Sequence, residues 1–162
     1  MEKIGIVFGC FIPFHIGHES LVKRALEEND RMIIAVCGYQ EDRGKDFLPF
    51  TVRYKLVKRM FRNNSRVIVA LIDDKKIGLD GTFTHENWVA WGKELFASAG
   101  IDPNSAHFNW YTGEPSYVEK LGPIYPDHVF NLVDRTVVNV SGTEIRSNPM
   151  DLSEDINKIF RE

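Results

Sequence analysis

A glycine-containing loop between an apolar run and a helical pattern constrains the fold of this chain most strongly. Residues 4–8 are apolar, the loop reads Gly9-Cys10-Phe11-Ile12-Pro13-Phe14-His15-Ile16-Gly17-His18, and helical periodicity continues to Glu28. This order predicts a strand, a tight loop and the start of a helix. The first backbone N–H groups of a helix lack intrahelical acceptors, and the helix dipole favours negative charge there. The loop is therefore predicted to bind an anion such as a phosphate.

The two histidines of the loop are three residues apart, so they share one face of the first helical turn. Gly17 between them has no Cβ and lets a nucleotide lie against the backbone. One alternative is a zinc site, but a catalytic zinc needs three protein ligands and this pair supplies two. Another alternative is a buried structural pair, but histidines that flank a glycine at a strand-to-helix turn are poor core material. The phosphate interpretation is favoured.

Apolar runs and helical patterns alternate along the whole chain. The runs cover residues 4–8, 32–38, 67–72, 107–111 and 128–133, and the helical patterns cover 15–28, 51–61, 85–99, 117–121 and 141–146. This alternation predicts an α/β fold, a Rossmann-like doubly wound parallel five-stranded sheet with helices on both faces. The first three runs are continuously apolar and are expected to be central strands. Ligands of such sheets bind beyond the carboxyl ends of the strands, where the loop at 9–18 is predicted to lie.

Composition limits the classes of function. The 162 residues, of which 43% are hydrophobic, fit one domain over 1–162. The net charge of −3 gives no basic field, so we expect no nucleic-acid partner. The longest apolar run, 32–37, is too short to span a bilayer, and the chain enters a predicted strand directly after Lys3. We expect a cytoplasmic protein without a membrane partner. Oligomeric state stays open, a homo-oligomer included.

Two polar loops follow predicted strands. Residues 39–49 contain Arg43, which is a candidate substrate contact because the loop lies at the ligand edge of the sheet, although a solvated loop is an equal alternative. Residues 73–83 contain two glycines and are a candidate lid.

Aromatic residues mark the helix predicted over 85–99, which contains Asn87-Trp88-Val89-Ala90-Trp91. Two Trp at i and i+3 share a face, so a core stripe is the simpler interpretation, above all for Trp91. Trp88 falls in the first turn, where its ring could instead stack on a planar ligand.

A second helix start follows near the carboxyl end of the sequence. Ser141-Gly142-Thr143-Glu144 has the pattern of a capping box, which is simply how many helices begin. It also adds the hydroxyl of Thr143 and the guanidinium of Arg146 to a second helix N-terminus, which would make a second phosphate cradle.

The loop motif Gly-x-Phe-x-Pro-Phe-His-x-Gly-His and the later Ser-Gly-Thr-x-Ile-Arg together resemble the nucleotidyltransferase superfamily, whose signatures are HxGH and an ISSTxIR-like motif. Class I aminoacyl-tRNA synthetases also contain His-Ile-Gly-His, but they need a Lys-Met-Ser-Lys-Ser type loop and a longer chain. The chain looks most like the adenylyltransferase domain of bifunctional bacterial nicotinamide mononucleotide adenylyltransferase/ribosylnicotinamide kinase proteins. The likeness runs through the two-Trp helix, 100–103, 111–112 and 135–146.

This resemblance implies the site residues. The catalytic residues would be His15, His18 and Arg146. The ATP-binding residues would be Gly9, Cys10, Phe11, Gly17, Gly113, Glu114, Arg135, Ser141 and Thr143. The residues that contact nicotinamide mononucleotide would be Trp88, which stacks on nicotinamide, Asn87 and Arg43.

The resemblance further implies transfer of an adenylyl group from ATP to nicotinamide mononucleotide, which gives NAD and pyrophosphate. Mg²⁺ would be held mainly by ATP phosphates, with no protein metal cage. Cys10 stands where relatives often carry Lys or Arg, so one phosphate contact would either be missing or be supplied by Lys55 or Arg53. No Gly-x-x-x-x-Gly-Lys-Ser/Thr loop occurs, so no kinase domain is expected. The alternatives are another phosphate acceptor (phosphopantetheine, flavin mononucleotide or glycerol phosphate) and a non-catalytic NAD or ATP sensor. The preference between nicotinamide and nicotinate mononucleotide stays open.

Overall fold

Helices and strands alternate along the chain as predicted. The structure, a computed structural model, describes residues 1–9, 11, 16–37, 50–73 and 84–133. The elements are β1 (Lys3–Gly9), α1 (Ile16–Glu28), β2 (Arg31–Val36), α2 (Phe50–Met60), β3 (Val67–Leu71), α3 (His85–Ala99), β4 (His107–Thr112), α4 (Pro115–Leu121) and β5 (Val129–Leu132). The sheet has the order β3-β2-β1-β4-β5, and every neighbouring pair is parallel. The predicted Rossmann-like five-stranded sheet is confirmed.

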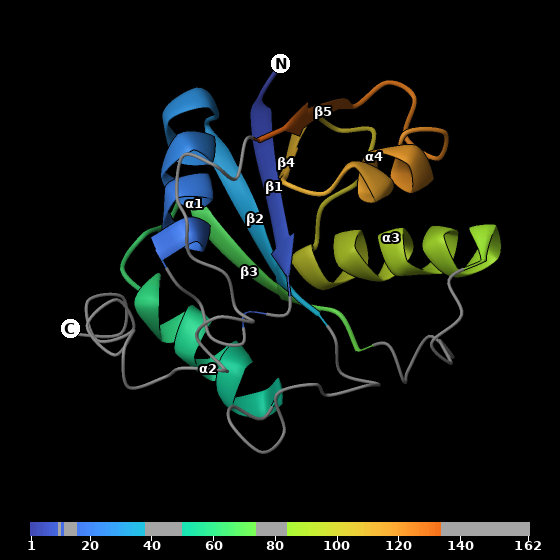
Figure 1. The fold of residues 1–162 in the computed structure, drawn as a ribbon. Helices are drawn as coiled ribbons and strands as arrows, with labels where there is room; N and C mark the ends of the chain where they lie inside the picture. The colour runs from blue at the N-terminus through green and yellow to red at the C-terminus, as the bar shows by residue number, and fades with distance from the viewer. Residues whose placement is uncertain (10, 12–15, 38–49, 74–83, 134–162) are drawn as a thin grey trace.

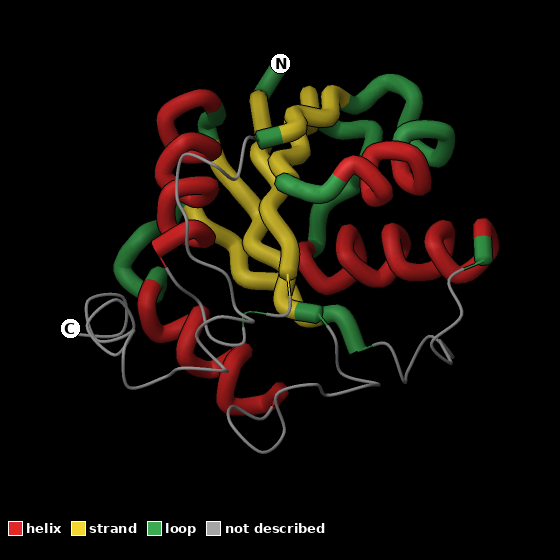
Figure 2. Tube along the Cα trace, viewed as in Figure 1, coloured by secondary structure: helices red, strands yellow, loops and turns green. Residues whose placement is uncertain are grey.

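Helices cover both faces of the sheet (Figures 1 and 2). α1 and α2 pack on one face and α3 and α4 on the other, because the chain moves outward from β1 to β3 and then crosses back to the other side of β1 to form β4 and β5. Side chains of β1 alternate between the two cores: Ile4 and Ile6 face α3, while Val7 faces α1. None of the described helices is long and apolar enough to cross a membrane.

The prediction that the first three strands are all central is wrong for β3. β3 is an edge strand in which Ala70 alone is fully buried, and β4 lies inside the sheet between β1 and β5. An apolar run reports burial of side chains but not the order of strands. The crossover from β3 through α3 to β4 places β4 beside β1, and no local pattern announces that step.

The ends of the predicted elements differ from the observed ones by one or two residues. The helix predicted over 85–99 matches α3, because Thr84 and Asn87 form a capping box at its start and Gly100 ends it in the left-handed conformation. The prediction over 117–121 misses the start of α4, where Pro115 occupies a position that needs no N–H donor. The helix predicted over 141–146 lies outside the described residues.

A buried polar network fixes the far end of α1 against β1 and β4. Asn29 Nδ2 donates to the Tyr111 hydroxyl (2.9 Å), which donates to a carboxylate oxygen of Glu28 (2.9 Å), and Asn109 Nδ2 donates to Asn29 Oδ1 (2.8 Å). A Cβ at Gly5 would lie 2.9 Å from Asn29 Nδ2, so the glycine makes room for the network. Burial raises the pKa of Tyr111. The network therefore sets how α1 lies on the sheet.

Replacement of Gly92 by alanine is expected to destabilise the protein, although alanine normally stabilises a helix interior. A Cβ at Gly92 would lie 2.2 Å from the Tyr125 hydroxyl oxygen and 3.0 Å from two Tyr125 ring carbons. Overpacking of this kind costs roughly 1–3 kcal/mol, more than the ~0.5–1 kcal/mol that alanine gains over glycine. Urea unfolding measures the effect. In a Tyr125→Ala background the same change should no longer destabilise, and a stabilised single variant would contradict the packing described.

Candidate active site

The carboxyl end of β1 lies where the strand order of the sheet reverses. β1 pairs with β2 on one side and with β4 on the other, and the helices that follow β1 and β3 cover opposite faces (Figure 1). In open α/β sheets this reversal opens the crevice in which ligands bind. The loop of the HxGH motif therefore begins at the place predicted for a ligand site.

Two residues of the motif are described at the start of α1. Gly17 and His18 lie in its first turn, directly after Ile16, and Gly9 is the last residue of β1. His18 thus stands at the positive end of the helix dipole, where a ligand phosphate is stabilised. Cys10 and His15 lie outside the described residues, so their predicted roles stay predictions.

Phe11 connects the end of β1 with His18. Its backbone has a φ of 52°, in the left-handed region, and its side chain is 2% exposed. That conformation costs a residue with a Cβ roughly 1–2 kcal/mol, while burial of a Phe side chain contributes about 1.5–3 kcal/mol. The ring meets the imidazole of His18 edge to face, with centroids 4.8 Å apart and planes at 86°.

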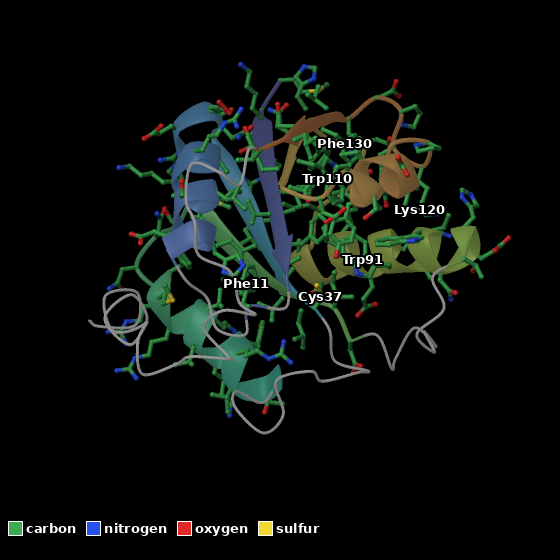
Figure 3. The ribbon with its side chains drawn as sticks, in the orientation of Figure 1. Phe11, Cys37, Trp91, Trp110, Lys120 and Phe130 are labelled. Carbon is green, nitrogen blue, oxygen red and sulfur yellow. The ribbon has the colours of Figure 1, made fainter. Side chains whose placement is uncertain are left out.

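A buried guanidinium lies at the end of β2, beside β1. Cys37, the residue after β2, donates its N–H to the Gly9 carbonyl (3.0 Å), and Arg53 Nη1 donates to the Cys37 carbonyl (3.3 Å). Arg53 is 1% exposed in the first turn of α2, whereas Lys55 is exposed. Figure 3 shows Phe11 and Cys37 at the same end of the sheet. Of the two cations considered as substitutes for one at Cys10, Arg53 is therefore connected through Cys37 to Gly9, where the loop begins.

Gly113 and Glu114, which are predicted to bind ATP, follow β4 at the same edge of the sheet. Val7 pairs with Tyr111, so β1 and β4 run side by side toward this edge. Glu114 N donates to the Thr112 hydroxyl (3.1 Å), which shapes the turn that contains Gly113 and leads into α4. The described part of the site thus combines the ends of β1, β2 and β4.

Trp88 is more buried than its first-turn position suggests. It is 7% exposed and belongs to the same core cluster as Trp91, with edge contacts to Trp91 (5.5 Å) and Tyr117 (5.8 Å). The core prediction for Trp91 is confirmed, and Trp88 shares that core. Tyr117, a neighbour that no sequence pattern signalled, contributes to this packing. Stacking on nicotinamide stays a prediction.

Asn87 is engaged in capping α3. Its Oδ1 accepts from Thr84 N (3.2 Å) and from the Thr84 hydroxyl (2.9 Å). Its predicted contact with nicotinamide mononucleotide therefore competes with a structural role.

The remaining predicted site residues, Arg43, Arg135, Ser141, Thr143 and Arg146, lie outside the described residues. No group of three His, Cys, Asp or Glu side chains among the described residues could hold a metal ion.

A parallel sheet whose central strand ends in the HxGH loop, with that loop opening the first helix, places the chain in the nucleotidyltransferase superfamily. Residues 6–148 match the family described as cytidylyltransferase-like. The chain belongs to that family.

Several known proteins are similar to this chain. The chain is 28% identical over 160 residues to the "Trifunctional NAD biosynthesis/regulator protein NadR" of Salmonella typhimurium. The matched region covers 91% of this chain and 37% of that relative. A crystal structure of NadR protein in complex with NR superposes with a TM-score of 0.84 at 28% identity, over 99% of this chain and 44% of that one. A probable nicotinate-nucleotide adenylyltransferase of Fusobacterium nucleatum is 36% identical over 83 residues, 50% of this chain and 43% of that relative. The matched region thus spans less than half the length of each of these relatives.

Proposed function

We propose that the chain transfers the adenylyl group of ATP to nicotinamide mononucleotide, which forms NAD and releases pyrophosphate. One observation carries the proposal: His18 lies in the first turn of α1, the helix that follows the central strand β1. A phosphate chain placed there meets a helix N-terminus and an imidazole together. The likeness to NadR over 91% of the chain supports the choice of acceptor.

The reaction depends on alignment of the two substrates more than on a reactive side chain. A phosphate oxygen of nicotinamide mononucleotide attacks the α-phosphorus of ATP, and the bond from that phosphorus to pyrophosphate breaks. The nucleophile comes from the substrate, so the protein supplies neither a covalent nucleophile nor a strong base. Its task is to hold both substrates in line and to stabilise charge on the α-phosphoryl oxygens and the leaving group.

The residues proposed for that task come from several elements. His18 donates to the phosphate chain at the start of α1, and His15 is proposed to join it from the loop. Thr143 and Arg146 are proposed to hold the β- and γ-phosphates. The buried guanidinium of Arg53 adds positive potential at the end of β2. Mg²⁺ bound to the ATP phosphates would neutralise part of the developing charge.

We propose that Mg²⁺ is held mainly by the ATP phosphates and water. We propose further that residues 1–162 form one nucleotidyltransferase domain. The described residues form one sheet with a core on each face.

An acceptor panel tests the proposed function. The protein is incubated with ATP, Mg²⁺ and one acceptor at a time: nicotinamide mononucleotide, nicotinate mononucleotide, phosphopantetheine, flavin mononucleotide or glycerol phosphate. Pyrophosphate and the nucleotide product are quantified by chromatography. We expect NAD formation with the highest kcat/KM for nicotinamide mononucleotide. Faster transfer to another acceptor would move the assignment within the family, and binding of ATP or NAD without turnover on any acceptor would favour a sensor.

Nicotinate mononucleotide is the second candidate acceptor, because the Fusobacterium relative is 36% identical over half of the chain. The two acceptors differ by an amide against a carboxylate. A protein cation that faces the carboxylate would favour nicotinate mononucleotide. An aromatic face alone favours nicotinamide mononucleotide, because its positively charged ring carries no carboxylate that would offset the charge. The ratio of the two kcat/KM values in the panel decides between them.

A further inference from the structure

Phe11 combines a strained backbone with a buried side chain. Its φ of 52° is the only left-handed value among the described residues other than glycine. A bulky residue adopts this conformation only where its surroundings determine it. Here the ring, 2% exposed, lies in the core cluster of α1 and α2 with Val7, Val22 and Tyr111. The left-handed turn therefore directs the ring inward, back toward the sheet.

Gly9 shapes the position of that ring. A Cβ at Gly9 would lie 3.3 Å from Phe11 Cε1 and 3.6 Å from two further ring carbons. The ring is thus pressed against the backbone at the end of β1, on the side where the HxGH loop begins. The same ring also contacts His18, whose imidazole it meets at 86° with centroids 4.8 Å apart. Phe11 thus contacts both the end of β1 and the imidazole.

From this geometry we propose that Phe11 is a positioning residue that orients the imidazole of His18 toward the phosphate chain. The inference rests on the proposed function, in which His18 acts in the transition state. An edge-to-face contact restricts the rotation of both rings. Because the Phe11 ring also packs closely against Gly9 at the end of β1, the orientation of His18 is tied to the strand that ends at the site. The strained backbone at Phe11 is what places the ring in this position.

A misplaced catalytic donor lowers the rate of the chemical step more than it weakens binding. Phe11→Leu keeps an apolar side chain but removes the ring that contacts His18. We expect this variant to lose about tenfold or more in kcat, with a change of less than about threefold in the KM for ATP. Phe11→Tyr keeps the ring and should retain more of the wild-type kcat than Phe11→Leu.

Phe108→Leu is the matched control. Phe108 is 1% exposed, and its ring packs against Phe96 and His128 in the core cluster on the opposite face of the sheet. The same substitution removes the same atoms there, so the two leucine variants should lower the melting temperature similarly. At a temperature at which both proteins are folded, Phe108→Leu should leave kcat within about twofold of the wild type. A merely structural role for Phe11 predicts equal kcat in the two variants.

Nuclear magnetic resonance of the histidine side chains tests the geometry without turnover. The ring protons of His18, assigned with the His18→Ala variant, should shift in Phe11→Leu because the ring current of Phe11 is lost, and they should stay unchanged in Phe108→Leu. A shift with unaltered kcat in an active enzyme would overturn the positioning role while leaving the proposed function intact. An absence of the shift in Phe11→Leu would overturn the contact itself. A wild-type protein that transfers no nucleotide would refute the proposed function, and with it the positioning role.

Discussion

His18→Ala is expected to lower kcat by on the order of 100-fold or more while the protein stays folded, which is the usual loss for one aligned donor. His18 lies in the first turn of α1, is partly exposed, and stands where phosphate charge would develop. Its removal takes away an interaction made mainly in the transition state, so KM for ATP should change much less than kcat. Steady-state kinetics and a thermal melt measure the two effects.

His107→Ala is the control for that experiment. His107 is exposed at the first residue of β4, at the opposite edge of the sheet from the HxGH loop. Its loss should leave kcat unaltered. Near-normal turnover of folded His18→Ala would show that the imidazole takes no part in the reaction.

Substitution of Trp88 is expected to have the second large effect. Because Trp88 is buried, two different substitutions are needed to separate its role in packing from its role in binding nicotinamide mononucleotide. Trp88→Ala should destabilise the fold by roughly 3–5 kcal/mol, because a Trp that is 7% exposed fills part of the α3 core. This loss would mask any effect on binding. Trp88→Phe keeps most of the packing and removes much of the indole face. It should raise the KM for nicotinamide mononucleotide severalfold, since a cation over an aromatic face contributes roughly 0.5–2 kcal/mol, and should leave the KM for ATP near its wild-type value.

Trp91→Phe is the matched control for Trp88→Phe. Trp91 lies one turn later on α3, is 3% exposed and belongs to the same core cluster. Both variants should show similar urea midpoints, but only Trp88→Phe should change the KM for nicotinamide mononucleotide. Equal KM values in the two variants would mean that Trp88 is a core residue alone. The acceptor assignment would then rest on the family likeness.

The sequence predicts the fold well where burial and capping are local. Runs of apolar residues identify all five strands, and the helix over 85–99 is found with correct ends because Thr84 caps it and Gly100 terminates it. The position of β3 at the edge is not predictable in this way. Strand order depends on a long-range choice, the docking of β4 beside β1, which leaves no mark in the apolar pattern of β3.

Side-chain surroundings in the site are predictable only in part. The strand-to-helix loop and its position at the strand-order reversal follow from the pattern of residues 4–28 and the family motif. The burial of Trp88 depends on Tyr117, which comes from α4, and the inward turn of Phe11 depends on the space left by Gly9. Both are contacts between elements or along a strained backbone, and periodicity carries no information about them.

The pairing of β1 with β4 also bears on the order in which the molecule assembles. Lys3 pairs with His107, so this central ladder joins strands that are separated along the chain by three helices and two strands. Closing so long a stretch of chain is entropically costly and slow compared with the nearer pairing of β1 with β2. During synthesis the half that contains β1, β2 and β3 can form first, but the crevice at the end of β1 has only one wall until β4 arrives. We therefore expect nucleotide binding to appear only after β4 has left the ribosome, and a bound nucleotide to slow the separation of β4 from β1.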